Sequence, residues 1–277
     1  MLLAVQDRTA AAATFADILG AVKVREDALE QPYNAKRTVV QAGESEFEFL
    51  EPAGEGIVAQ HFEQWGEGIF AAGFSTSDAG GVARSMQDEG LHFTYQGSEI
   101  FVEPDQTRGM RTVIRESEKR EAVGHISHLY EVTNIVDDFE EAAGFYASIF
   151  GLDKSRFSPI TSKHFGYTGS LTLFDPPARL DRIELTQITD PEGAMGRFYG
   201  RRGASVYMCF AESPNVAAIR EALEAREARI QPTGEFPDSG LFIHPRALHG
   251  MLMGISYTNV AWKWSGRPEL APTNAAV

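Results

Sequence analysis

The chain has 277 residues with a formal net charge of −14, and 43% of them are hydrophobic, as in ordinary globular proteins. This length accommodates one large domain or two of ordinary size, and no apolar run approaches the roughly 20 residues that span a bilayer, so we expect no membrane partner. The acidic balance argues against nucleic acid as a partner, because a polyanion is repelled unless a local basic patch overrides the field.

Segments of the first half recur in the same order in the second half. In each pair the apolar residues and the glycines or prolines fall at similar positions. The pairs are VQDRTAAAATFADILG (5–20) with VDDFEEAAGFYASIFG (136–151), FEFLEP (47–52) with IELTQI (183–188), GIFAAGF (68–74) with ASVYMCF (204–210), and FVEPDQTRGMRTVI (101–114) with FIHPRALHGMLMGI (242–255). Ordered matches of this kind indicate that the chain is a tandem duplication.

Each half divides again into two units of one pattern, a short strand, a helix and three further strands. The clearest helix is NVAAIREALEAREARI, in which Val216, Ile219, Leu223 and Ile230 recur at helical spacing with charges on the opposite face. The sequence therefore predicts an α+β fold of four βαβββ modules. Their pairing gives two tandem cup-shaped mixed β-sheet barrels, each with a cavity lined by side chains.

The predicted linker is a charged run that ends in glycine, ESEKREAVG (116–124). We therefore expect an N-terminal domain at 1–117 and a C-terminal domain at 118–266. The last segment, 267–277, has no apolar periodicity, so we expect a flexible tail.

These modules resemble the vicinal oxygen chelate superfamily over roughly residues 1–260. The resemblance rests on a helix of the form AAxFYxxxxG, an xEL strand and a final FxHPxxxHG hairpin. The superfamily includes glyoxalase I, methylmalonyl-CoA epimerase, extradiol dioxygenases, and the fosfomycin and bleomycin resistance proteins. It implies the fold and leaves the reaction open, because this fold hosts many chemistries.

The resemblance assigns up to four metal-ligand positions in the second cup. HISHLYEVTNI puts His128 at the first position, with His125 as an alternative register, and RIELTQ puts Glu184 at the second. Tyr207 stands at the third position, where the family usually has histidine. Gly254 stands at the fourth, where it has glutamate. Two ligand types are kept and two are lost.

A divalent metal in the second cup would therefore depend on His128 and Glu184. Two ligands are too few, so a third would have to come from His164, Tyr207 or His244. A standard extradiol dioxygenase is not expected. Such enzymes use the first, third and fourth ligand positions, and of these three only the first, His128, is kept here.

The first cup offers fewer ligands than the second. Glu48 stands at the second position, Ala71 at the third and Val113 at the fourth. One carboxylate cannot hold a metal, so we expect the first cup to be structural.

The predicted catalytic residues are Glu184, His128 and Tyr207. Glu184 lies between Ile183 and Leu185, and an inward carboxylate there is costly to bury unless it meets His128, a metal or a substrate proton. A raised carboxyl pKa suits a base that removes a proton α to a carbonyl. We predict Glu184 as base or ligand, His128 as ligand or acid-base group, and Tyr207 as donor to an enolate oxygen.

Three further residues are predicted to contact the substrate. His164 lies on a predicted strand of the third module, and His244, in the final hairpin, is expected to reach the cavity rim. Arg197 belongs to RFYGRR, the one basic cluster, which can receive a carboxylate or phosphate. The structural alternatives are a solvated loop for Arg197 and a proline-set turn for His244.

The sequence thus favours an enzyme that acts on a small carbonyl or enolisable substrate by proton abstraction, as an isomerase, epimerase or lyase. The alternatives are a metal-free binding protein of the bleomycin-resistance type, or an aromatic-compound dioxygenase with a rearranged ligand set. The N-terminus has no basic n-region or cleavage site and Cys209 has no partner for an internal disulfide, so we expect a cytoplasmic protein. Two cups in one chain leave both a monomer and a homodimer open.

Overall fold

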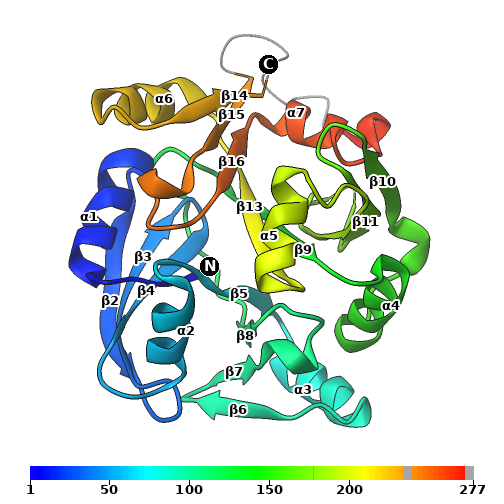
Figure 1. The fold of residues 1–277 in the computed structure, drawn as a ribbon, viewed down its shortest axis with the longest axis horizontal. Helices are drawn as coiled ribbons and strands as arrows, with labels where there is room; N and C mark the ends of the chain where they lie inside the picture. Colours follow the sequence, from blue (N-terminus) through cyan, green and yellow to red (C-terminus); the bar gives the residue numbers. More distant parts are fainter. Residues whose placement is uncertain (177, 234–238, 272–277) are drawn as a thin grey trace.

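The computed structural model describes residues 1–176, 178–233 and 239–271, and it contains two eight-stranded sheets, one from each half (Figure 1). The strand order is β2-β3-β4-β1-β5-β8-β7-β6 in the first sheet and β10-β11-β12-β9-β13-β16-β15-β14 in the second. The two orders are equivalent, so each sheet consists of two βαβββ modules. The predicted α+β fold with two tandem curled sheets is confirmed.

The elements follow the repeat closely. The strands of the first half are β1 (Leu2–Ala4), β2 (Val22–Leu29), β3 (Ala35–Ala42), β4 (Ser45–Pro52), β5 (Gly68–Thr76), β6 (Phe93–Gln96), β7 (Glu99–Val102) and β8 (Thr112–Glu116). Those of the second half are β9 (His128–Ile135), β10 (Ser158–Ser162), β11 (Tyr167–Leu173), β12 (Arg182–Ile188), β13 (Ser205–Glu212), β14 (Ile230–Pro232), β15 (Gly240–Ile243) and β16 (Met253–Ser256).

The α-helices and the short 3-10 helices connect these strands. The α-helices are α1 (Arg8–Leu19), α2 (Ile57–Trp65), α3 (Ala79–Asp88), α4 (Phe139–Phe150), α5 (Ala194–Arg202), α6 (Val216–Ala225) and α7 (Thr258–Lys263). The 3-10 helices are η1 (Pro104–Gln106), η2 (Lys154–Arg156), η3 (Pro245–Ala247) and η4 (Pro268–Leu270). Within the described ranges, no helix is long and apolar enough to cross a bilayer.

The first helix of each half is fixed by the same pair of end residues. Asp7 and Asp138 each accept two hydrogen bonds from backbone N–H groups in the first turn of α1 and α4. The helices end at Gly20 and Gly151, which have left-handed φ angles of 66° and 65°. Glycine adopts this conformation without the steric cost that a Cβ would impose. The caps therefore explain why both copies keep the aspartate and the glycine.

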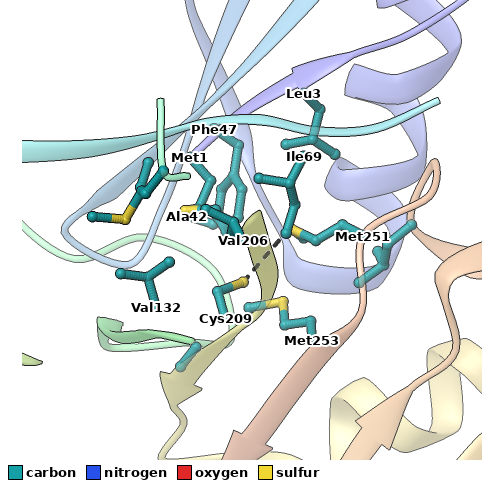
Figure 2. Close-up of a cluster of buried hydrophobic side chains, with 14 of the residues drawn as sticks. Met1, Leu3, Ala42, Phe47, Ile69, Val132, Val206, Cys209, Met251 and Met253 are labelled. Carbon is teal, nitrogen blue, oxygen red and sulfur yellow. Dashed lines mark hydrogen bonds between the residues drawn. The ribbon is translucent and has the colours of Figure 1, made fainter. Parts of the chain in front are cut away.

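The two halves share one hydrophobic core. Figure 2 shows Leu3 and Ile69 of the first half in the same cluster as Val132, Cys209 and Met251 of the second, and all five are buried. Each large aliphatic side chain removed from water in this way contributes roughly 1.5–3 kcal/mol. Helix α1 also contacts α6, and α3 contacts α4, so helices of opposite halves lie side by side (Figure 1). The halves therefore form one packed unit.

Each half also places a glycine against the backbone of the other half. A Cβ on Gly109, where φ is 92°, would collide with the carbonyl oxygen of Ala204. A Cβ on Gly250, where φ is 85°, would collide with the carbonyl oxygen of Glu67. The glycine that both copies of the final hairpin keep therefore permits close contact between the halves.

Helices fill the inside of both cups. Val58 of α2 is fully buried among the apolar side chains of the first cup, such as Leu50 and Phe70. In the second cup Trp262 of α7 is 2% exposed and packs in a cluster with Phe210. The second cup is thus covered by the C-terminal helix, which the sequence did not predict.

The segment expected to be a flexible tail begins with an ordered turn. Residues 268–270 form η4, and Leu270 and Ala271 pack against the apolar cluster of the second cup. The Arg267 guanidinium donates a hydrogen bond to the carbonyl oxygen of Ser155 at 3.2 Å. The rest of the predicted tail, 272–277, lies outside the described residues.

Candidate active site

Polar side chains gather on the inner face of the second cup, where β12 runs parallel to β9. The strand register sets Arg182 beside Glu131 and Glu184 beside Thr133. Ile183 and Leu185 point into the shared core, because successive side chains of a strand face opposite sides. All four polar residues are buried. Strand alternation therefore delivers two carboxyl groups, a guanidinium and a hydroxyl to one place.

Glu184 has the most perturbed chemistry of this group. It is 8% exposed, and the Thr133 hydroxyl donates a hydrogen bond of 2.7 Å to its Oε2. Burial, and then the negative charge of Glu131, raise the pKa of Glu184 to about 8, against the opposing effects of Thr133, Arg182 and Tyr167. At neutral pH Glu184 is therefore mostly protonated, while a small increase in pH makes it a base.

Arg182 is the cation of the cluster. It is 3% exposed, and its Nε donates a hydrogen bond to Glu131. Its guanidinium lies 5.1 Å from the centroid of the Tyr130 ring. Its Nη1 is buried and has no hydrogen-bond partner among the residues that the structure describes. A buried N–H group without a partner is unfavourable, so Arg182 retains capacity to bind an oxygen atom.

A cavity of about 760 Å³ opens between the halves and reaches this cluster. Tyr130, Glu131 and Arg182 line it from the second half, and Glu48 and Arg115 line it from the first. Its volume is in the range that accepts a small organic molecule. Glu184 lies on the same face of β12 as Arg182 and two residues further on, roughly 7 Å along the strand.

Comparison with solved structures identifies the fold. A mutant form of 4-hydroxymandelate synthase from Streptomyces coelicolor matches with a TM-score of 0.68 over 97% of this chain and 96% of that chain, at 14% sequence identity. The chain has the vicinal oxygen chelate fold. Methylmalonyl-CoA epimerase from Mycobacterium tuberculosis gives a TM-score of 0.41 at 19% identity, over 50% of this chain and 91% of that chain. No family model and no curated protein matches the sequence.

The vicinal oxygen chelate fold implies a divalent metal at the cup floor, and the residues of the second cup do not fit one. At the fourth ligand position, a Cβ on Gly254 would collide with the ring of Phe210, so the space for a ligand is filled by that ring. The Arg182 guanidinium beside Glu131 would repel a metal cation. Among the described residues, no three His, Cys, Asp or Glu side chains are grouped as a metal site. The rearranged ligand set of a dioxygenase is not found there either.

The structure does not bring His128 and Glu184 together. His128 is the first residue of β9 and pairs with Glu212 of β13, whereas Glu184 pairs with Thr133. Thr133 lies five positions after His128 on β9, roughly 16 Å along an extended strand. Instead of His128, it is Glu131 that faces the charged residues of β12. His128 is half-buried, and its Nε2 has no hydrogen-bond partner in the described part of the chain.

Tyr207 of β13 and Arg197 of α5 lie near each other, and α5 contacts both β12 and β13. Tyr207 is at an irregularity of β13, and its ring packs edge-on against Phe198 of α5, with 5.0 Å between the centroids. Burial raises the pKa of the Tyr207 phenol, and the charge of Arg197 offsets part of that shift. Arg197 is exposed on α5 and donates a hydrogen bond to the carbonyl oxygen of Glu192. Their roles toward a substrate stay predictions.

His164 and His244 lie outside the polar cluster. His164 is exposed in the turn between β10 and β11, with its ring 4.7 Å from that of Phe165. His244 precedes η3, and its Nδ1 accepts a hydrogen bond of 3.3 Å from the backbone N–H of Arg246. It lines a different cavity.

Four residues of the cluster were missed from sequence, namely Glu131, Thr133, Tyr167 and Arg182. Arg182 carried a usable signal, because it precedes Glu184 by two positions in RIELTQ and must share its face. The other three lie on β9 and β11, and only the pairing of those strands with β12 reveals them.

The first cup contains a buried ion-pair network in place of a reactive carboxyl group. Arg37 donates hydrogen bonds to Glu48 at 2.9 Å and to Glu99 at 2.6 Å, and Arg115 also pairs with both carboxylates. Burial alone would raise the pKa of Glu48, but Arg115 and Arg37 outweigh it and hold the pKa below its ordinary value. A carboxylate so fully paired is a weak base, and the structural role expected for this cup stays a prediction.

Proposed function

We propose that the chain is an enzyme that moves a proton on a small carbonyl or enolisable compound, with Glu184 as its acid-base group. The observation that carries this proposal is the buried polar cluster of the second cup. It joins a carboxyl group whose pKa is raised to about 8 to a buried, incompletely bonded guanidinium on the same strand face. A base with a pKa near the working pH is the most effective one for proton abstraction.

The steps follow from the chemistry of these residues. The ionised Glu184 removes a proton from the carbon next to the carbonyl, and the electrons of that C–H bond pass to the carbonyl oxygen. The Arg182 guanidinium, which Glu131 holds in place, stabilises the enolate oxygen by hydrogen bonding and charge. Protonated Glu184 then returns the proton to a neighbouring carbon on the same face, which gives isomerisation; epimerisation requires a second donor, such as water, to protonate the opposite face of the enolate. Loss of a leaving group from the enolate gives the lyase outcome.

Thr133 and Tyr167 position the carboxyl group of Glu184. Thr133 fixes one oxygen of Glu184 by its hydrogen bond of 2.7 Å. Tyr167, which is half-buried, interacts with the same carboxyl group, and burial followed by the charge of Glu184 raises the pKa of its phenol. Both residues are positioning groups in this proposal.

The experiment measures the exchange of the substrate's α-proton in D2O. The loss of the α-proton signal in NMR spectra gives the exchange rate. A panel of α-keto acids, α-hydroxy ketones and thioesters is incubated with the parent protein, Glu184→Gln, Arg182→Gln and the control Glu221→Gln, which changes an exposed residue of α6. We expect Glu184→Gln to lower the exchange rate roughly 100-fold or more. The rate of the parent should rise with pH and level off above about pH 8.

The result that refutes the proposal is exchange by Glu184→Gln at the rate of the parent and of Glu221→Gln. A chelator present throughout the assay should leave the rate unchanged. Loss of exchange on chelation would show that a metal ion, and not the cluster alone, carries the chemistry.

The second candidate is a binding protein, and the aromatic cluster of the second cup, which reaches the cavity at Tyr130, favours it. The Phe210 ring lies 6.0 Å from that of Tyr130, 5.6 Å from that of Phe242 and 6.0 Å from that of Trp264. Of these rings, that of Tyr130 also lines the cavity of about 760 Å³, where it can contact a planar apolar ligand. Quenching of tryptophan fluorescence by an aromatic ligand, without exchange on any member of the panel, would favour this candidate.

A further inference from the structure

A second cavity, of about 660 Å³, lies where the two halves meet at α1, the end of α6 and η3. Its wall is strongly basic for a chain with a net charge of −14. Arg226, Arg229, Arg246, His244 and His249 line it, and Glu227 is the carboxylate among its lining residues. This cavity is separate from the polar cluster of the second cup and shares no lining residue with the first cavity.

Two of the basic residues that line the cavity, Arg226 and His249, already have partners in the first half. Arg226 forms an ion pair with Asp17 of α1. The Nδ1 of His249 lies 3.0 Å from the Glu67 carboxylate, and its Nε2 lies 3.2 Å from the Thr14 hydroxyl. These contacts join the second half to the first at the edge of the cavity.

The remaining basic groups are uncommitted. The guanidinium groups of Arg229 and Arg246 are exposed and form no ion pair with any residue that the structure describes. The backbone N–H of Arg246 donates to Nδ1 of His244, so the neutral ring carries its proton on Nε2 and can donate there. Burial, then the charges of Arg229 and Arg246, lower the pKa of His244, which places both guanidinium groups in its vicinity.

We propose that this cavity binds a small molecule that carries a phosphate group. Two guanidinium groups that have no ion pair among the described residues line it together with the imidazole of His244, and a phosphate has enough oxygen atoms to accept from all three. A carboxylate is satisfied by a single arginine, so it leaves the second fork unused. The volume exceeds what a phosphate alone occupies, and Ile18, Ala228 and Ala247 provide apolar wall for an organic remainder.

Calorimetric titration with phenyl phosphate, at constant ionic strength, tests the proposal. The variant is the double substitution Arg229→Gln and Arg246→Gln, and a charge-matched control pair is Arg84→Gln with Lys23→Gln, both exposed residues of the first half. Charge-assisted hydrogen bonds to a phosphate are stronger than neutral ones, and the double variant loses those of both guanidinium groups. We therefore expect the double variant to bind at least tenfold more weakly and the control pair to bind within twofold of the parent protein.

Benzoate, which has the same ring on a carboxylate, should bind more weakly than phenyl phosphate. NMR spectra of the unmodified protein give a second measurement, in which phenyl phosphate should shift the amide signals of Ala228 and Ala247. The proposal is overturned if those signals do not move at millimolar phenyl phosphate, or if the control pair loses as much affinity as the double variant. Equal affinity for benzoate would overturn the assignment of a phosphate group.

Discussion

Replacing Glu184 with glutamine is expected to stabilise the protein, and to do so more strongly as the pH rises. Glutamine has nearly the same shape as glutamate and cannot ionise. In the folded protein the pKa of Glu184 is about 8, whereas its ordinary value is 4.5. Below pH 4.5 the carboxyl group is protonated in both the folded and the unfolded chain, so the two proteins should have similar stabilities.

Between pH 4.5 and pH 8 the unfolded chain releases the Glu184 proton and the folded chain retains it. The free energy of unfolding then falls by about 1.4 kcal/mol for each pH unit, and above pH 8 it falls no further. At pH 7 the accumulated loss is roughly 3 kcal/mol, which Glu184→Gln should recover. Urea unfolding curves at pH 4, 5.5, 7 and 8.5 measure the difference, with Glu221→Gln as the exposed control. A difference between Glu184→Gln and the parent that does not change with pH would refute the assigned environment of Glu184.

Three further predictions concern the packing and the first cup. Gly250→Ala should lower the free energy of unfolding by roughly 2 kcal/mol or more, because its Cβ meets the Glu67 carbonyl at a left-handed φ of 85°. In contrast, Gly200→Ala, a helical site with open space, should be neutral or stabilising; equal losses in thermal melts would contradict this. The Cys209 thiol, whose pKa burial raises to about 12, should react with a disulfide reagent only after unfolding, and rapid native labelling would count against it. Glu48→Gln should cost roughly 2–3 kcal/mol in urea unfolding at pH 7, because it removes a buried carboxylate that Arg37 and Arg115 share while both keep Glu99 as a partner, and a loss under 1 kcal/mol would contradict this.

The modular fold was predictable because its determinants are local and occur twice. Asp7 with Gly20, and Asp138 with Gly151, mark the ends of equivalent helices. Such caps and the apolar repeat can be recognised without knowledge of the tertiary structure. The closing helix of the second cup was missed because Trp262 belongs to a segment without a counterpart in the repeat.

The candidate site was only partly predictable. Glu184 could be found because a carboxyl group between two apolar strand residues is conspicuous. Its partners depend on strand register, and a shift of one residue exchanges the faces of a strand. β9 and β13 pair with two such shifts, near Tyr207 and near Phe210. The resemblance selected His128, while the pairing of β9 with β12 puts Glu131 opposite Arg182 and Thr133 opposite Glu184.

The core that both halves share has a consequence for synthesis on the ribosome. The first half is completed while Val132, Cys209 and Met251 have not yet been made, so Leu3 and Ile69 lack the side chains that cover them in the finished protein. We expect this nascent half to expose an aggregation-prone apolar surface for the several seconds that translation of the second half requires. Chaperone capture during that interval, and poor recovery of residues 1–117 expressed alone, are the expected results.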